Sequence, residues 1–289
     1  IDSNIIHMHS KNIQNHDNKN NIDKIKSMKS TYLTPNYTFN DNNKFSIFYN
    51  RRVDRPNEVD IRIFPKYDDA EIIKVGNPAL RPQFTNAIEL AYKTTWESGS
   101  LYNAIYHRIA DGTITRISST TPPSNLIYAI FQNVNKSYNS GVEIIYAQEI
   151  SKKYKFSINL NGYKNQIDAF SVENKYPITH LFSAAKQEIF SGNLKLNNTF
   201  HFAKNIDAQL TAIYLAPDII PQGKINSRFS LDIGVKKLIQ KGKGELFFNA
   251  TDLFNTMITK KEIKGQGFIY TSNDYYETQV IRVGYSYKF

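Results

Sequence analysis

A chain of 289 residues without a single cysteine cannot form a disulfide, a thiolate metal site or a cysteine nucleophile. Its mean hydropathy of −0.48 and the lack of any run of about 18 apolar residues exclude a helical membrane protein, but not a membrane β-barrel, whose strands are apolar only at every second position. The net charge of +10 comes from scattered basic residues without a basic block or helical face, so no nucleic-acid partner is predicted.

Residues 1–30 are rich in asparagine, lysine and aspartate and keep no sustained period, which predicts a loop or disordered segment. No secretory signal is visible at its start, so we expect the sequence to be that of a mature form or of a fragment. His7, His9 and His16 fall here, and histidines can bind transition metals. Because no carboxylate accompanies them at a spacing typical of a closed site, we predict a solvated segment and no metal site.

From residue 31 onward, apolar residues recur at every second position, the pattern of strands with one apolar and one polar face. At the end of the chain, for example, Ile281 and Val283 share one face, whereas Arg282 and Gly284 share the other. A helix would place these polar residues inside its apolar stripe. The pattern predicts eleven strands, at 32–40, 44–52, 84–95, 100–109, 136–150, 154–165, 186–202, 206–215, 226–239, 244–252 and 277–289.

The connections between these strands alternate strictly between short and long. Turn-forming residues fill the short ones, which lie at 41–43, 96–99, 151–153, 203–205 and 240–243. The long ones, expected to be aperiodic loops, are 53–83, 110–135, 166–185, 216–225 and 253–276. Outer-membrane barrels have this asymmetry, with tight periplasmic turns and extended extracellular loops. A soluble sandwich is not expected to alternate short and long connections in this way.

Aromatic residues support the membrane interpretation. The chain has 19 tyrosines and 18 phenylalanines, and many of them fall near the predicted strand ends. Amphipathic rings are stable where hydrocarbon meets headgroups, so barrels carry an aromatic girdle at each interface. The alternative is an aromatic-rich core in a soluble β-sandwich, although leucine, valine and isoleucine are expected to dominate such a core.

Five groups of residues resemble the TonB-dependent receptor, outer-membrane β-barrel family, over about residues 31–289. They are Arg55-Pro56; the passage with Gly76, Asn77, Pro78, Leu80 and Pro82, followed by Asn86 and Glu89; the strand opening with Gly141 and Glu143; Asp252-Leu253-Phe254-Asn255; and the ending with Tyr285, Tyr287 and Phe289. Each motif is weak alone, but their ordered series is fairly specific.

The resemblance implies an all-β fold, an antiparallel transmembrane β-barrel in the outer membrane of a Gram-negative cell. Residues 31–289, with about 11 strands, would be the C-terminal part of a barrel of roughly 22. The implied partners are outer-membrane lipid, the barrel-assembly machinery that reads Tyr285, Tyr287 and Phe289, and TonB through an N-terminal part. Neither the plug nor a TonB-contacting box is visible in this sequence, so an uptake cycle does not follow from this chain alone.

The candidate ligand-binding regions are loops 53–83, 110–135, 166–185 and 253–276. Arg55 and Arg81 are weak candidates for holding an acidic ligand, but pairing with Asp54, Glu58 or another loop carboxylate is the stronger expectation.

Three acidic residues of the motifs, Glu89, Glu143 and Asp252, are expected on the polar face, beside lysines and arginines of neighbouring strands. The ligand itself cannot be derived from the sequence, because specificity resides in the loops.

The sequence predicts no enzyme and no cofactor, because it contains no nucleophile elbow, zinc-helix motif, phosphate loop or dinucleotide fingerprint. Ser183 follows His180 closely, but no carboxylate accompanies His180 or His107 to orient it, so these are weak ligand-binding candidates only. The favoured function is import of a scarce extracellular ligand, such as a siderophore, metal complex, glycan or peptide. The alternative is an adhesin or assembly component whose barrel anchors binding loops.

Overall fold

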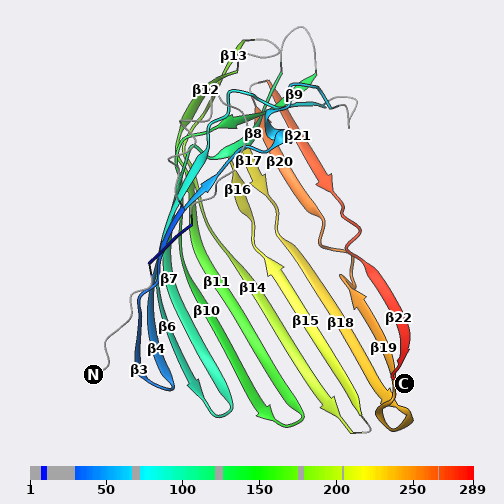
Figure 1. Cartoon of the computed structure of the whole chain (residues 1–289). Helices are drawn as coiled ribbons and strands as arrows, with labels where there is room; N and C mark the ends of the chain where they lie inside the picture. The colour runs from blue at the N-terminus through cyan, green and yellow to red at the C-terminus, as the bar shows by residue number, and fades with distance from the viewer. Residues whose placement is uncertain are drawn as a thin grey trace.

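A computed structural model of the chain describes residues 8–11, 30–66, 72–120, 126–174, 179–203, 205–265 and 267–289. One 13-stranded antiparallel sheet dominates it and curves into a trough (Figure 1). Its strands are β1 (Met8–Lys11), β2 (Ser30–Leu33), β3 (Asn36–Asn40), β4 (Asn43–Asp54), β6 (Gln83–Trp96), β7 (Gly99–Asp111), β10 (Ser137–Ser151), β11 (Tyr154–Ile167), β14 (Gln187–Phe202), β15 (Ile206–Leu215), β18 (Arg228–Ile239), β19 (Gly244–Thr251) and β22 (Val280–Tyr287). The prediction of an all-β, antiparallel fold is confirmed.

Each of the eleven predicted strands corresponds to a strand of this sheet, with one interruption. The segment predicted as 32–40 divides at Thr34-Pro35 into β2 and β3, which both pair with β4. Proline has no backbone N–H and cannot donate to the strand ladder. The Pro35 carbonyl still accepts a bond of 3.0 Å from the Ile47 N–H, so the two pieces remain in line.

The segment expected to be a loop contains a strand. Met8–Lys11 forms β1 and pairs antiparallel with β2, with Met8 opposite Leu33. His9 therefore lies in a strand, whereas His7 and His16 lie outside the described residues. Strand β2, which lies at the N-terminal end of the predicted strand region, provides a partner that the local composition of residues 1–30 does not reveal.

The hairpin turns lie together at the lower end of the sheet in Figure 1, and the chain ends there too. Asn205 and Lys241 adopt left-handed backbone conformations at two of these turns, with φ of 59° and 58°. Lys241 belongs to the short segment η1 (Gln240–Gly242), in which Gln240 and Gly242 also have a positive φ, of 53° and 89°.

The long connections gather at the opposite end, and they are not aperiodic as the sequence suggested. They form sheets of their own: β5 (Ile72–Val75) with β9 (Ile127–Asn133) and β8 (Ile114–Thr120); β12 (Phe170–Asn174) with β13 (His180–Ala184); and β16 (Asp218–Ile220) with β17 (Gly223–Ile225), β20 (Thr259–Gly265) and β21 (Phe268–Asp274). A single helical turn, α1 (Glu58–Ile61), begins at Asn57 with a capping box. A small apolar cluster of Ile117, Val134 and Phe170 joins this region.

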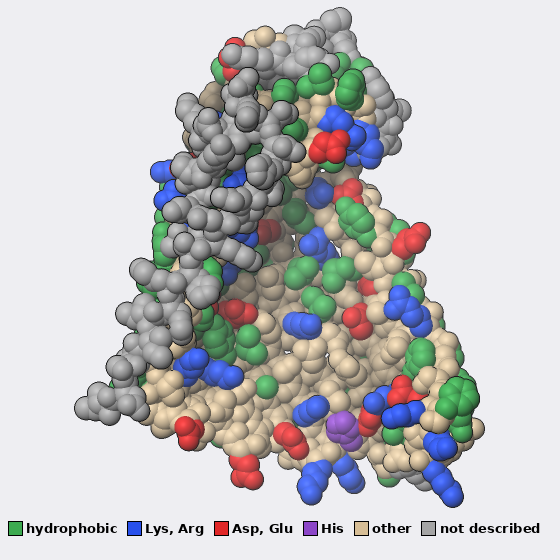
Figure 2. Space-filling model, in the orientation of Figure 1, with side chains coloured by type: hydrophobic (Ala, Val, Ile, Leu, Met, Phe, Trp, Pro, Cys, Tyr) green, Lys and Arg blue, Asp and Glu red, His purple; other side chains and the backbone are tan. Residues whose placement is uncertain are grey.

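The two faces of the large sheet differ in the way that the alternation predicted. Large apolar side chains on the convex face are exposed, such as Ile105 at 63% and Val283 at 76%. On the concave face, Ala91 of β6 and Ala104 of β7 are buried. Figure 2 shows this hollowed face, where lysine, arginine, aspartate and glutamate are scattered over an otherwise largely uncharged polar surface. No helix among the described residues is long and apolar enough to cross a membrane.

An aromatic ladder crosses the convex face near the hairpin turns. Successive ring centroids lie 4.9 to 5.9 Å apart along Trp96, Tyr146, Phe156, Tyr154 and Phe200. Their polar atoms are satisfied by side chains, since the Trp96 indole donates to Gln148 at 3.0 Å and the Tyr154 hydroxyl donates to Asn198 at 2.8 Å. Such a row of amphipathic rings is typical of a membrane interface.

The Gly76-Asn77 motif ties the first long connection to the sheet beside it. Gly76 and Asn77 donate backbone bonds to Arg62 and Asp60, at 2.9 and 2.7 Å. The Asn77 amide also donates to the Phe131 carbonyl of β9 at 3.0 Å. Glycine is required here by the close approach of this backbone rather than by a positive φ, because a Cβ on Gly76 would lie 2.5 Å from the Arg62 nitrogen.

Gly76→Ala is therefore expected to destabilise this connection by about 1–3 kcal/mol, because the clashing atoms belong to backbone and cannot rotate away. Faster proteolytic cleavage within residues 53–83 of the folded protein measures the effect. Gly162→Ala is the matched control, since a Cβ on Gly162 meets nothing within 4 Å. Equal cleavage rates for both variants would contradict the role assigned to the motif.

The chain ends on the exposed convex face of β22. Phe289 is fully exposed and its ring lies edge-on to Tyr287, 5.3 Å between centroids. We expect deletion of Phe289 to reduce the amount of membrane-inserted protein several-fold, because terminal alternating aromatics are the proposed recognition element for insertion. Heat-modifiable migration of outer-membrane fractions measures this, with Lys288→Gln as a control that keeps the aromatic residue. Undiminished heat-modifiable protein after the deletion would reject the hypothesis.

Candidate ligand-binding site

The concave wall carries a network of uncharged hydrogen-bond donors around two carboxylates. The Tyr102 hydroxyl donates to Glu89 Oε1 at 2.7 Å, across the β6–β7 pair. The Asn159 amide donates to Glu143 Oε1 at 3.1 Å, across the β10–β11 pair. Glu89 and Glu143 thus face the polar side as predicted, but their partners are a tyrosine and an asparagine rather than the expected lysines and arginines.

Gly141, two residues before Glu143, leaves room for a tyrosine ring on this wall. A Cβ on Gly141 would lie 2.6 Å from the Tyr106 hydroxyl and 2.7 Å from its ring. That hydroxyl donates to Asn161 Oδ1 at 2.8 Å, so the ring spans strand β10 between β7 and β11. The glycine of this motif therefore has a packing role on the concave face.

The wall continues upward into the hairpin of β16 and β17. Tyr163 and Asn165 of β11 both donate to the Asp218 carboxylate, at 2.9 and 2.8 Å. Ser191 of β14 donates to the Pro217 carbonyl at 2.6 Å. These bonds hold the start of the hairpin against the concave side of the trough.

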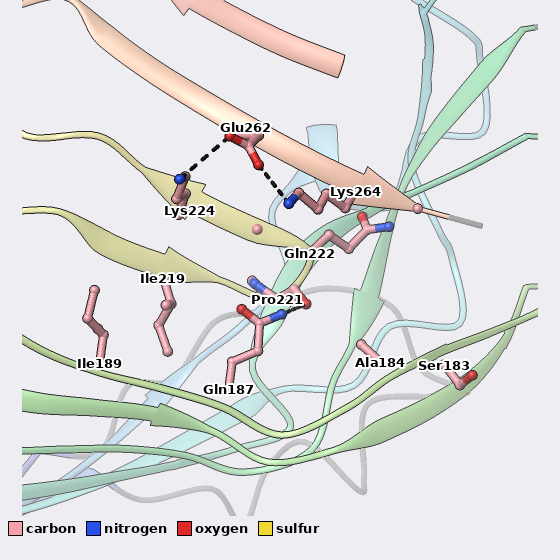
Figure 3. Close-up of a pocket in the computed structure, with 12 residues that line it drawn as sticks. Ser183, Ala184, Gln187, Ile189, Ile219, Pro221, Gln222, Lys224, Glu262 and Lys264 are labelled. Carbon is pink, nitrogen blue, oxygen red and sulfur yellow. Dashed lines mark hydrogen bonds and ion pairs between the residues drawn. The ribbon is translucent and has the colours of Figure 1, made fainter. Parts of the chain in front are cut away.

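A cavity of about 750 Å³ lies above this anchor, where three connections converge (Figure 3). Ile189, Ile219 and Pro221 give it an apolar side, and Gln187 donates from β14 to the Pro221 carbonyl at 3.0 Å. Its volume is in the range of small-molecule binding sites, which combine apolar walls with a few placed polar groups.

The charged side of the cavity is a set of two lysines around one glutamate. Glu262 of β20 lies 2.9 Å from Lys264 Nζ and 3.6 Å from Lys224 Nζ (Figure 3). The hydrogen bond from Lys264, together with the positive charges of both lysines, lowers the pKa of Glu262 below its ordinary value. The three side chains together keep one positive charge, which favours a ligand with an acidic or electron-rich group.

A buried glutamine connects the cavity to the neighbouring sheet. Gln222 accepts from the Ser118 N–H at 2.5 Å and donates to the Ser118 carbonyl at 2.7 Å, so its side chain imitates a strand pairing with β8. Gln222 is 6% exposed, and both of its amide atoms are satisfied. The two extracellular sheets are therefore joined beside the cavity.

The weak candidate residues from the sequence do not gather at this cavity. Arg55 and Arg81 are exposed, and their pairing with a loop carboxylate stays a prediction. Of the two carboxylates named for it, Asp54 pairs with Arg52 at 3.0 Å, and Glu58 with Arg62 at 3.9 Å. The reason is local geometry, because each of these pairs lies within one strand end or one helical turn.

The two candidate histidines are also elsewhere. His107 lies on the convex face, 2.7 Å from Ser140 Oγ and stacked on Tyr138. His180 begins β13. Among the described residues, no group of three or more histidine, aspartate or glutamate side chains is arranged to hold a metal ion.

The residues that sequence reasoning missed come mainly from 216–225, a connection that was not among the candidate ligand loops. It supplies Ile219, Pro221, Gln222 and Lys224 to the cavity. The signal was present, because a short apolar run before a Pro-Gln-Gly turn is a hairpin pattern.

Comparison with known proteins identifies the family. The family model described as "Outer membrane protein beta-barrel family" matches residues 9–287, and the chain belongs to this family. The protein is thus an outer-membrane β-barrel protein, as the TonB-dependent receptor resemblance implied, and its location is the Gram-negative outer membrane. No curated protein matches the sequence at a significant level.

Several solved structures share the fold. The chain is similar to the siderophore receptor PirA from Pseudomonas aeruginosa, with a TM-score of 0.57, 11% identity, and coverage of 79% of this chain and 39% of that one. It is similar to the FrpB iron transporter from Neisseria meningitidis (TM-score 0.54, 9% identity, 91% and 39% coverage). It is also similar to the ferric-catecholate import receptor Fiu from K12 E. coli (0.51, 13%, 81% and 31%). The chain therefore spans well under half the length of these proteins.

Proposed function

We propose that this chain forms the C-terminal wall and part of the extracellular vestibule of a larger, roughly 22-stranded receptor barrel that imports a scarce extracellular ligand. The ligand class is a siderophore, metal complex, glycan or peptide. Energy for import would reach the barrel from TonB through the plug-bearing part of the complete protein, and the chain itself performs no catalysis.

The observation that carries the proposal is the continuity between the cavity and the concave wall. The hairpin that bounds the cavity is bonded through Asp218 to Tyr163 and Asn165, and the polar network around Glu143 and Glu89 follows below. A solute released from the cavity therefore meets hydrogen-bonding side chains rather than hydrocarbon. An adhesin needs only exposed loops and gains nothing from a polar path behind them.

The test uses the complete gene product that contains this chain, expressed in the outer membrane of a strain lacking its own siderophore receptors. Uptake of radioiron-labelled ferric catecholate and hydroxamate siderophores is measured with and without a functional TonB, and labelled oligosaccharides and peptides extend the panel. TonB-dependent accumulation of one probe class is the expected result. Adhesion of the cells to host protein or glycan, with no probe accumulated, would favour the anchoring alternative.

A separate variant tests the cavity as the binding site. Replacing Lys224 and Lys264 together by alanine is expected to weaken binding of the transported probe about tenfold, because one charged side of the cavity is removed. Replacing Lys152 and Lys153 together by alanine, at the hairpin turn between β10 and β11 on the opposite end, is the charge-matched control. Equal affinity of the double variant and the control would exclude this cavity as the binding site.

A further inference from the structure

A cluster of basic residues lies on the lipid-facing side of the sheet, away from the cavity and the concave wall. Lys164 Nζ and Lys186 Nζ lie 3.1 and 3.0 Å from the same oxygen of Glu188. Both ammonium groups therefore converge on one carboxylate, and the cluster keeps one uncompensated positive charge. We call Lys164, Lys186 and Glu188 the rim cluster.

Strand register places the rim cluster on the convex face. Lys164 has the same parity in β11 as Tyr154 of the aromatic ladder, and it lies opposite Phe190 of β14. Phe190 is 80% exposed, and the Lys164 ammonium lies 5.5 Å from the centre of its ring. A lysine whose stem extends along an exposed apolar ring and whose charged end reaches a polar group is the arrangement found at membrane interfaces.

The depth of the cluster follows from the length of the strand. Ten residues separate Tyr154 from Lys164, which is about 33 Å of strand and about 25 Å along the membrane normal at a tilt of about 40°. An apolar band of about 25 Å is typical of these barrels. The outward positions between the two residues carry no charge: Phe156, Ile158, Leu160 and Gly162. Lys164 is therefore at the level where hydrocarbon gives way to the headgroups of the outer leaflet.

Neighbouring strands are polar at the same level. Ser140 of β10 pairs in register with Lys164 on one side and with His107 of β7 on the other. The His107 ring and the Ser140 hydroxyl are 2.7 Å apart. Hydrogen-bonding groups thus continue sideways from the rim cluster across β10 and β7, which suits a bulky polar headgroup.

We propose that the rim cluster binds the phosphate of an outer-leaflet lipid headgroup. The anion would sit on the outer side of the two ammonium groups, where Glu188 leaves one positive charge unbalanced. A lipid is the occupant, rather than a soluble anion, because the cluster is continuous with the apolar face that hydrocarbon covers and points away from the lumen. The site is independent of the ligand cavity and of the proposed transport function.

The experiment uses the complete gene product, purified in detergent, with diphosphorylated lipid A and chemically dephosphorylated lipid A as the two probes. Lipid retained per folded protein is measured by native mass spectrometry. We expect preferential retention of the phosphorylated probe. Replacing Lys164 and Lys186 by glutamine is expected to lower that retention about 25-fold, since each of the two basic residues at a lipid surface contributes about a fivefold factor. Heat-modifiable migration selects folded samples for every variant.

Two further variants make the test sharp. Glu188→Gln is expected to raise retention about fivefold, because it removes the negative charge between the two lysines while keeping the size of the side chain. Lys237→Gln is expected to change nothing, since Lys237 has the outward parity of β18 but lies at its periplasmic end. Equal retention of both probes, a loss as large in Lys237→Gln, or no gain in Glu188→Gln would overturn the proposal. Displacement by millimolar inorganic phosphate without lipid would assign the cluster to a soluble anion instead.

Discussion

Replacing Ile158 by arginine is expected to destabilise the folded protein by about 2–4 kcal/mol. Ile158 lies on the convex face of β11, with Tyr146 and Leu196 directly opposite on the neighbouring strands. It stands between the aromatic ladder and the rim cluster, within the uncharged part of the face. An arginine there must hold its charge in hydrocarbon or bend toward an interface, and both cost free energy.

The adjacent residue provides the control. Asn159 points to the concave face and donates to Glu143, so Asn159→Arg places the new charge beside water and a carboxylate. Its effect is expected to be small. Urea-induced unfolding of the complete protein in phospholipid vesicles measures both variants, with tryptophan fluorescence as the signal. Equal destabilisation by the two substitutions would show that the convex face is not covered by lipid.

The long strands could be predicted from the sequence because the polarity of each side chain indicates which face of the sheet it occupies. A period of two separates residues that face hydrocarbon from residues that face water, and the hairpin turns contain strong turn formers. Pairing of the two strands on either side of each short turn then follows from the turn alone. A predicted strand was wrong where a local feature interrupts the period-two pattern, as Pro35 does between β2 and β3.

The extracellular sheets could not be predicted, because they depend on contacts between distant parts of the chain. Gln222 pairs with Ser118, 104 residues earlier, and β17 pairs with β20 from a different connection. Strand β5 even pairs parallel to β9 across an intervening hairpin of the large sheet. Short strands with weak alternation acquire their partners only when the large sheet has brought the connections together.

In the candidate site, too, the face on which a residue lies could be predicted, but its partners could not. The sequence correctly placed Glu89 and Glu143 on the polar face, since parity decides that. It did not reveal their partners, because Tyr102 and Asn159 are neither the commonest partners of a carboxylate nor charged. Two of the carboxylates expected to pair with Arg55 and Arg81 have nearer partners along the chain, since Asp54 pairs with Arg52 and Glu58 with Arg62.

Asp252 shows how one motif residue can hold a whole connection. It follows β19, is 2% exposed, and its backbone has a φ of 43°. Its carboxylate accepts from the N–H groups of Thr256 and Met257 at 3.0 and 3.1 Å, and from the Thr278 hydroxyl at 2.6 Å. The two ends of the connection that contains β20 and β21 are thereby fastened to one side chain. The expected basic partners of Asp252 are replaced by hydroxyl and backbone donors.

Asp252→Ala is expected to destabilise this connection by about 3 kcal/mol, because it removes three bonds to a charged acceptor, two of them from part-buried N–H groups. Asp252→Asn keeps the shape and tolerates the left-handed backbone, so about half of that loss is expected. Protease cleavage within 253–276 of the folded protein measures both. Cleavage of Asp252→Ala at the wild-type rate would contradict the fastening role.

The same carboxylate makes the connection sensitive to acid. Burial opposes ionisation of Asp252, but the hydrogen bonds from Thr278, Thr256 and Met257 outweigh it, and the pKa is lowered overall. A carboxyl whose folded pKa lies below its unfolded value of about 3.9 stabilises the fold fully above that value. The stabilisation is lost as the pH falls below about 4 and through the folded pKa.

Protease cleavage in 253–276 is therefore expected to accelerate in this pH range for the wild type. In Asp252→Asn this component of the acceleration disappears, although Asp274 and Glu262, whose pKa values are also lowered, still contribute theirs. Identical pH profiles for the two proteins would show that Asp252 is not ionised in the folded state.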